Sequence, residues 1–227
     1  MAAAAALAIL DSLKPELVIF DCDGVLVDTE RMEVSVLAEA LSWYGIDHDA
    51  ALILEQSRGG SLARLQLAIE EIHGEPLPED FADRYRAHQL TVLPKVPAIE
   101  GAVEAIEAAG SNRCVASGGP MYKMEVTLKA TDLWDHFAPN IFSCYDIDSH
   151  KPEPDIYLHA AAALGIEPAR CLVIEDSATG VRASATAGMF VIGLARDTVP
   201  ASLLDAGAQI TVPTMVEASA LISRARS

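Results

Sequence analysis

Short, almost continuously apolar runs recur along the chain, and segments with helical periodicity separate them. The runs are rich in Val and Ile and lack the alternation of apolar and polar residues that marks a half-buried strand. Runs of this kind are typical of strands in parallel sheets that helices cover on both faces. The predicted strands are Glu16–Phe20, Arg113–Ser117, Asn140–Phe142, Arg170–Glu175, Met189–Leu194 and Gln209–Val212.

Helical patterns occupy the intervals between most of these strands. They cover Gly101–Ala109, Met121–Ala130, Pro154–Leu164 and Ser177–Ala187, and three of them end at Gly110, Gly165 and Gly188. Glycine is common directly after the last turn of a helix. The alternation predicts an α/β fold with a Rossmann-like, doubly wound parallel sheet, in which binding sites lie at the carboxyl ends of the strands.

One long interval, between Phe20 and Arg113, contains no convincing strand. Its apolar residues instead form helical stripes, the first ending at Gly45, the second at Gly74, and a third beginning at Pro78. The prolines at positions 94 and 97 mark a stiff linker that returns to the sheet. We therefore expect residues 31–95 to form an inserted, all-helical cap domain, and residues 1–30 and 96–227 to form the α/β core.

Composition narrows the classes of partner. The chain has 227 residues, of which 51% are hydrophobic, so a disordered protein is excluded. It carries 33 acidic and 16 basic side chains, a formal net charge of −17. This charge disfavours nucleic acid and membrane surfaces as partners, and no apolar run is long enough to span a bilayer. An anionic substrate would have to be met by local positive charge, a metal ion or backbone amides.

The cysteines and the N-terminus indicate a cellular compartment. The four cysteines have no CxxC spacing and most lie in or beside apolar runs, which favours buried free thiols in a reducing compartment over disulfides. The alanine-rich N-terminus has no basic residue before Lys14, so we expect a frayed helical turn there and not a signal peptide. A cytoplasmic protein, either a monomer or a small homo-oligomer, fits this pattern.

Two acidic residues follow the first predicted strand, in the segment FDCDG. Asp21 and Asp23 are two positions apart just after Phe20. Side chains at positions i and i+2 of an extended segment point the same way, so the two carboxylates should converge at the end of the strand. Such a pair must bind a proton or a cation to offset its repulsion. The alternative is an acidic turn without a function.

The other strand ends carry further candidate residues. Glu175 and Asp176 end the strand CLVIE, and a second acidic pair at the same sheet edge favours a hard divalent cation such as Mg²⁺. Ser117 and Gly118 end another strand, where a hydroxyl and free backbone amides can hold phosphate oxygens. Lys151, in KPEPD, offers a point charge for a phosphoryl group. Taken singly, each of these features is more often solvent-exposed and without a function.

The order of these motifs, DxDG, Ser, KPxPD and EDS, resembles that of the haloacid dehalogenase superfamily of phosphotransferases over residues 17–195. The resemblance implies an aspartyl-phosphate mechanism with a helical cap. Asp21 would be the nucleophile and Asp23 the general acid/base, while Ser117, Gly118 and Lys151 would bind the phosphoryl group. Mg²⁺ would be bound by the carboxylates of Asp21 and Asp176 and by the backbone carbonyl of Asp23. Glu175 would lie in or near its coordination shell.

Within the superfamily, the resemblance is to the branch of sugar phosphatases and β-phosphoglucomutases. An acid at position 23 implies a phosphate ester as substrate, and the segments FSCYDIDSHKPEPDIYLHAA and SGGPMYKM are most similar to 6-phosphogluconate phosphatases. The segment SRGGSL is closer to the mutase cap loop, so Arg58 is a candidate for binding a second anionic group of the substrate.

The expected function is therefore a Mg²⁺-dependent phosphatase of small phosphorylated sugars or sugar acids. The alternative enzyme is a hexose-phosphate mutase of the β-phosphoglucomutase type. A signalling receiver also combines an acidic cluster with Ser and Lys, but the DxD spacing and the long helical insert disfavour it.

Overall fold

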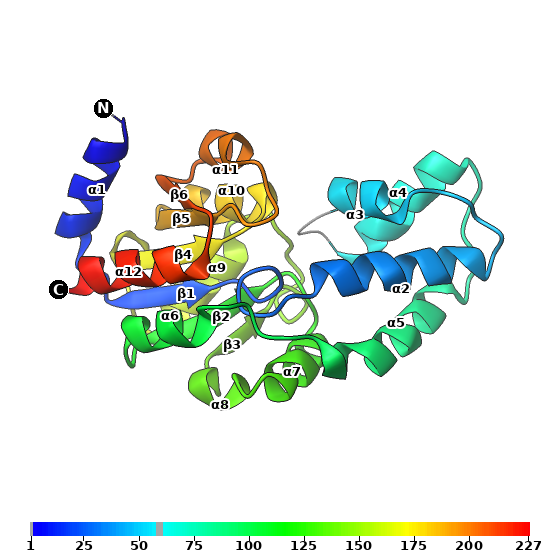
Figure 1. Cartoon of the computed structure of the whole chain (residues 1–227), viewed down its shortest axis with the longest axis horizontal. Coiled ribbons are helices and arrows are strands. Elements are labelled where there is room, and N and C mark those ends of the chain that lie inside the picture. The colour runs from blue at the N-terminus through cyan, green and yellow to red at the C-terminus, as the bar shows by residue number, and fades with distance from the viewer. Residues whose placement is uncertain (1, 58–60) are drawn as a thin grey trace.

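The computed structural model describes residues 2–57 and 61–227, and a parallel six-stranded sheet forms its centre (Figure 1). The strand order is β3-β2-β1-β4-β5-β6. This order places the three strands that end in candidate residues, β1, β2 and β4, side by side. Each predicted strand is confirmed to within one residue at either end: β1 Leu17–Phe20, β2 Arg113–Ser117, β3 Ile141–Ser143, β4 Cys171–Glu175, β5 Phe190–Leu194 and β6 Ile210–Val212.

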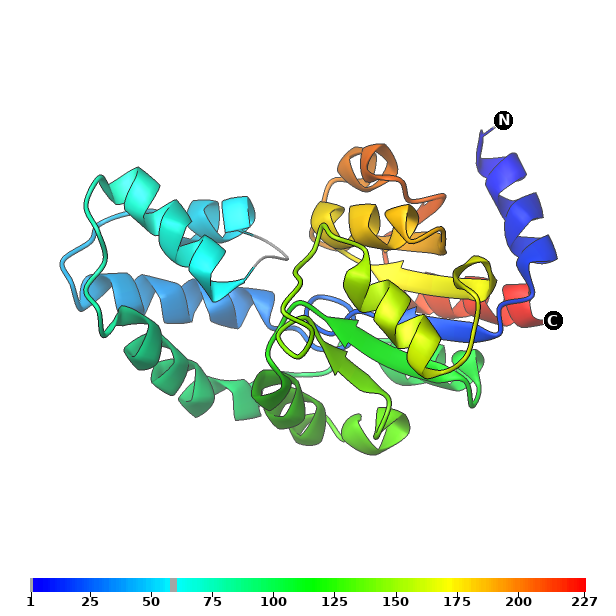
Figure 2. The same cartoon turned by 180° about the vertical axis from the view of Figure 1, so that it is seen from behind.

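Helices cover both faces of the sheet, as the apolar runs predicted (Figures 1 and 2). Along β1, Val18 and Phe20 pack into the cluster that includes α6 and α12, whereas Leu17 and Ile19 pack on the opposite face against α9 and α10. All four β1 side chains are fully buried. The helices of the core are α1 Ala2–Leu13, α6 Ala102–Ala109, α7 Met121–Ala130, α8 Trp134–Phe137, α9 Asp155–Ala163, α10 Ala178–Thr186, α11 Pro200–Ala206 and α12 Met215–Arg226, with 3₁₀ turns at Leu93–Lys95 and Pro168–Arg170.

The long interval after β1 is helical, and in its described part β-structure is limited to isolated bridges. Its helices lie together beside the sheet (Figure 1) and bury a hydrophobic cluster of their own, centred on Leu37, Ile69 and Phe81. Three of them were predicted, whereas α3 was not. The division of the chain at residues 31 and 95 stays a prediction. The helices are α2 Glu30–Ser42, α3 Ala50–Ser57, α4 Leu62–His73 and α5 Phe81–Val92.

The N-terminal segment is more ordered than the sequence suggested. A frayed turn was expected, but α1 continues to Leu13 as a regular helix. Leu10 is fully buried, and both carboxylate oxygens of Asp11 accept hydrogen bonds from Arg224 of α12, at 2.5 and 2.7 Å. This docking supplies the tertiary contacts that a short helix needs in order to persist.

The structure bears on the expectations about the cysteines and about membrane-spanning segments. All four cysteines are free and buried, as expected. Across the described part of the chain, every helix is too short or too polar to cross a lipid bilayer.

Candidate active site

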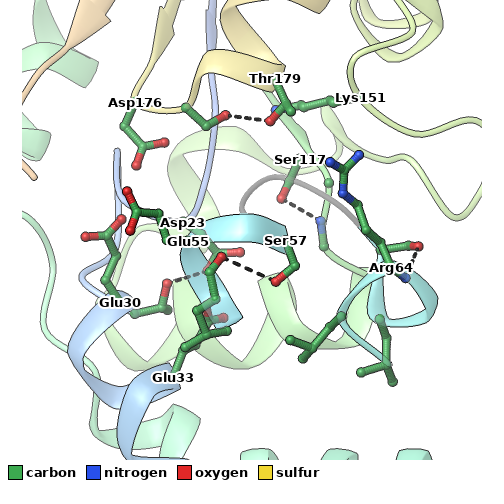
Figure 3. A pocket seen from close by; sticks show the side chains of 18 of the residues that line it. Asp23, Glu30, Glu33, Glu55, Ser57, Arg64, Ser117, Lys151, Asp176 and Thr179 are labelled. Carbon is green, nitrogen blue, oxygen red and sulfur yellow. Dashed lines mark hydrogen bonds between the residues drawn. The ribbon is translucent and has the colours of Figure 1, made fainter. Parts of the chain in front are cut away.

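The candidate residues meet where β1, β2 and β4 end. Phe20 of β1 is in register with Val115 of β2 and Ile174 of β4, so the residues that follow these positions lie at one edge of the sheet. Asp21 comes directly after β1, Ser117 is the last residue of β2, and Glu175 is the last of β4. Figure 3 shows Ser117, Lys151 and Asp176 around one pocket. The parallel topology therefore brings together motifs that are far apart in the sequence.

Lys151 reaches this edge from the loop before α9 and links two carboxylates. Its Nζ lies 2.6 Å from Asp21 Oδ1 and 2.6 Å from Glu175 Oε1, and it also donates a hydrogen bond to the Ala116 carbonyl at 3.3 Å. Burial by itself would lower the pKa of Lys151, but Asp21 and Glu175 together raise it well above its usual value. The ammonium group stays charged although only 3% of the residue is exposed.

Glu175 is held on both carboxylate oxygens. Oε1 accepts hydrogen bonds from Lys151 and from Tyr157 Oη, the latter at 2.8 Å, and Oε2 accepts from the backbone and hydroxyl of Ser177 at 3.0 Å. Burial opposes ionisation, but Lys151 outweighs it and holds the pKa of Glu175 below its usual range. Gly180 leaves the space for this side chain, because a Cβ there would lie 1.7 Å from Glu175 Oε1.

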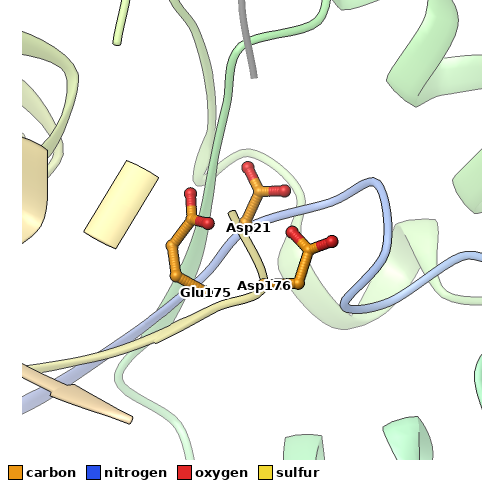
Figure 4. Close-up of side chains that lie close together, drawn as sticks. All are labelled: Asp21, Glu175 and Asp176. Atoms are coloured by element: carbon orange, nitrogen blue, oxygen red, sulfur yellow. The ribbon is translucent and has the colours of Figure 1, made fainter. Parts of the chain in front are cut away.

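Three carboxylates at this edge could hold a metal ion. Oxygens of Asp21, Asp176 and Glu175 lie within 4.8 Å of one another, and Figure 4 shows the three side chains facing a common space. Gly24 helps to keep that space open, because a Cβ at this position would lie 2.2 Å from Asp176 Oδ2. A donor set made only of carboxylate oxygens suits a hard divalent cation. The residues present therefore fit Mg²⁺.

The environment of Asp21 also favours a nearby cation. Burial raises the pKa of Asp21 to about 7, although the charge of Lys151 acts in the opposite direction. A divalent cation beside the carboxylate would lower that pKa and keep the side chain ionised. Glu175 differs, because hydrogen bonds already occupy both of its oxygens. Its contacts favour a role in holding Lys151, and direct metal binding by Glu175 stays a prediction.

Asp23 lies beside the same pocket and has two partners of its own. Oδ1 accepts a hydrogen bond from Thr29 Oγ1 at 2.8 Å, and Oδ2 lies 2.9 Å from Lys123 Nζ of α7. Lys123 also forms an ion pair with Glu33 of α2. Binding of a metal by the Asp23 carbonyl stays a prediction.

Ser117 and Gly118 line the pocket where a phosphoryl group would sit. The Ser117 hydroxyl accepts a hydrogen bond from the Gly119 backbone at 3.0 Å, and Ser143 in turn donates to the Gly119 carbonyl at 2.7 Å. These bonds order the turn after β2. The Gly119 amide is bonded to Ser117, so the Ser117 hydroxyl and the Gly118 amide are the groups of this turn that could bind a phosphoryl oxygen.

The pocket has a volume of about 990 Å³, and both the core and the helices between residues 30 and 92 line it. That size accommodates a small organic phosphate together with water. Among the described residues, the helical segment contributes two arginines to the lining, Arg64 and Arg86. Arg58, the candidate for binding a second anionic group, lies outside the described residues and stays a prediction.

Some residues of the site were not predicted from the sequence. Tyr157, Ser177 and Lys123 all contact candidate catalytic carboxylates or their partners. The sequence signal for Lys123 is limited to its place beside apolar residues of a helical pattern, Met124 and Leu128, and this signal does not identify an acidic partner.

Comparisons with known proteins agree with this geometry. A family model described as haloacid dehalogenase-like hydrolase matches residues 15–188. The 6-phosphogluconate phosphatase of Escherichia coli (strain K12) is 32% identical over 184 residues, 80% of this chain and 83% of that protein. Hexitol phosphatase B of the same strain is 28% identical over 180 residues, 75% of this chain and 79% of that protein.

A solved structure extends the similarity to the fold. The crystal structure of a haloacid dehalogenase-like protein from Agrobacterium tumefaciens matches with a TM-score of 0.79 and 33% identity, over 92% of this chain and 97% of that chain. The resemblance in motif order is thereby confirmed. The chain belongs to the haloacid dehalogenase-like hydrolases and is a phosphoric monoester hydrolase of that family.

Proposed function

We propose that this enzyme is a Mg²⁺-dependent phosphatase that hydrolyses small phosphorylated sugars or sugar acids through an aspartyl-phosphate intermediate. The observation that carries the proposal is the buried contact of Asp21 with Lys151, beside Asp176 and at the ends of neighbouring strands. A carboxylate can attack a phosphate dianion only where positive charge offsets the repulsion between them. Here Lys151 supplies a positive charge, and the carboxylates of Asp21 and Asp176 could bind a metal cation.

Each residue would have a defined role in the reaction. Oδ1 of Asp21 is bonded to Lys151, so Oδ2 is the oxygen available to attack phosphorus. Lys151 and Ser117 would bind the phosphoryl oxygens, and Asp23 would protonate the leaving oxygen and then accept a proton from the attacking water. Asp21 and Asp176 would hold Mg²⁺, which supplies charge neutralisation when bound.

A phosphorylated sugar or sugar acid is supported as substrate by the names of the relatives and by the pocket. The two Escherichia coli relatives are named for 6-phosphogluconate and hexitol phosphates. Beyond the phosphoryl site, the pocket presents many hydrogen-bonding groups, Glu55, Ser57 and Gln89 among them, which suit hydroxyl groups. The proposed partner is thus a small-molecule phosphate ester. The cytoplasmic location and the oligomeric state remain expectations from the sequence.

A panel of phosphate esters tests the proposal. With Mg²⁺, the enzyme should release inorganic phosphate from sugar phosphates and sugar-acid phosphates and from p-nitrophenyl phosphate. If glucose 1-phosphate yields glucose 6-phosphate faster than it yields phosphate, the enzyme is the alternative hexose-phosphate mutase. An absence of turnover on every ester would contradict both assignments.

Removal of the metal should abolish most of the activity. Chelation with EDTA is expected to lower phosphate release by about 10²-fold or more, because charge neutralisation by a metal ion is worth several kcal/mol. Added Mg²⁺ should restore the rate. Asp176→Asn should need a higher Mg²⁺ concentration for half-maximal activity, since one carboxylate ligand is lost. Full activity after thorough chelation would overturn the metal assignment.

Replacement of Asp23 should affect substrates according to their leaving group. For Asp23→Ala we expect leaving-group release from sugar phosphates to fall by about 10²-fold or more, the usual worth of general acid catalysis. A sugar alkoxide leaves poorly without a proton, whereas p-nitrophenolate leaves readily. Single-turnover release of p-nitrophenol should therefore change much less. Equal losses on both substrates would contradict the acid/base role.

A further inference from the structure

A buried lysine connects Asp23, the proposed general acid, to helix α2. Lys123 is on α7 of the core and is only 8% exposed. Its Nζ lies 2.9 Å from Asp23 Oδ2 and also binds Glu33 Oε1 of α2. Burying a charged lysine is costly unless it is paired. The two acidic partners, Asp23 and Glu33, offset this cost for Lys123.

The contacts of Asp23 show what Lys123 can do there. Lys123 binds one carboxylate oxygen of Asp23, and Thr29, at the start of α2, binds the other. Thr29 is the last residue of the loop that carries Asp23, whereas Lys123 reaches Asp23 from α7. The plane of the carboxyl group is thus set by one donor at the N-cap of α2 and one on α7, and Glu33 of α2 binds the same lysine.

We propose that Lys123, braced by Glu33, is a positioning residue that orients Asp23 toward the leaving oxygen of the substrate. The inference rests on the proposed function, because it needs Asp23 to act as the general acid. It predicts that removing the ammonium group impairs acid catalysis although Asp23 itself is still present. Small displacements of a catalytic group can cost about 10²-fold in rate.

The test measures how the rate depends on the leaving group. Single-turnover release is followed for a series of aryl and alkyl phosphates of increasing leaving-group pKa, in wild type, Asp23→Asn and Lys123→Met. General acid catalysis keeps this dependence shallow, because the proton offsets a poor leaving group. Lys129→Met is the matched control, since Lys129 is on the same helix but is exposed and paired with Glu125.

For Lys123→Met we expect a steeper dependence, in the direction of Asp23→Asn, with a loss of about 10–10²-fold on alkyl phosphates and little change on p-nitrophenyl phosphate. Lys129→Met should match wild type. A uniform loss across the series in Lys123→Met, with Asp23→Asn steep, would show that Lys123 is only structural and would overturn the inference. An unchanged dependence in Asp23→Asn would instead overturn the acid/base assignment on which it rests.

A second variant keeps the test decisive if Lys123→Met does not fold. Replacing the lysine alone leaves Asp23 and Glu33 as partly buried acids without their counter-ion. The double variant Lys123→Gln with Glu33→Gln removes one charge of each sign and so avoids an added net charge. We expect the same steepened dependence on the leaving group from this variant. A dependence as shallow as that of wild type would again overturn the inference.

Discussion

Asp21→Asn should reduce turnover by about 10⁴-fold or more because it removes the nucleophile, while the protein stays folded because Glu175 still pairs with Lys151. The two side chains have nearly the same shape. Burial already raises the pKa of Asp21 to about 7, so this position tolerates an uncharged side chain better than most aspartates would. Phosphate release under single-turnover conditions measures the effect, and circular dichroism and thermal unfolding check the fold.

A matched control separates the chemistry from the substitution itself. Asp135→Asn makes the same change at an exposed position of α8, away from the lining of the pocket, and should leave turnover unaltered. Acid-quenched wild-type enzyme should carry a phosphoryl group on the peptide that contains Asp21, detectable by mass spectrometry, and Asp21→Asn should carry none. Hydrolysis within tenfold of wild type in Asp21→Asn would refute the covalent mechanism.

Much of the fold could be predicted because buried strands have a recognisable hydrophobic pattern in the sequence. Strands covered on both faces have nearly continuous apolar runs, and all six were found. Helix α3 was missed because it is short and Leu52 on it is half-exposed, so its residues form no clear stripe. The extent of α1 depends on its docking against α12 through Asp11, which no local pattern reveals.

Some residues of the site could likewise be predicted from the sequence, and others could not. Asp21, Ser117 and Glu175 could be placed because a parallel sheet gathers its strand ends, and this follows from the strand pattern alone. Lys123 could not, since its contact with Asp23 joins residues 100 positions apart and depends on how α7 packs beside the loop after β1. For Glu175, the sequence suggested a metal ligand, but only the structure shows that Lys151 and Tyr157 share one of its oxygens.

Lys151→Met should lower both activity and stability, because this ammonium group serves two carboxylates at once. Turnover should fall by about 10³-fold or more, since a charge that binds the transferring phosphoryl group is lost. The free energy of unfolding should fall by about 3–5 kcal/mol, the usual result of removing one partner from a buried ion pair. Without Lys151, burial opposes ionisation at both carboxyl groups, so Asp21 and Glu175 would each have to take up a proton or stay as a buried charge without a counter-ion.

A double variant distinguishes the two losses. Glu175→Gln added to Lys151→Met removes a buried acid, keeps an amide oxygen for the two Ser177 donors and places the amide nitrogen where it can donate to the Tyr157 hydroxyl, so most of the lost stability should return. Activity should not return, because the phosphoryl group still lacks its cation. Chemical denaturation and single-turnover kinetics on the wild type and the three variants, including Glu175→Gln alone, measure both effects. If activity recovers together with stability, Lys151 acts by supporting the fold and not by binding phosphate.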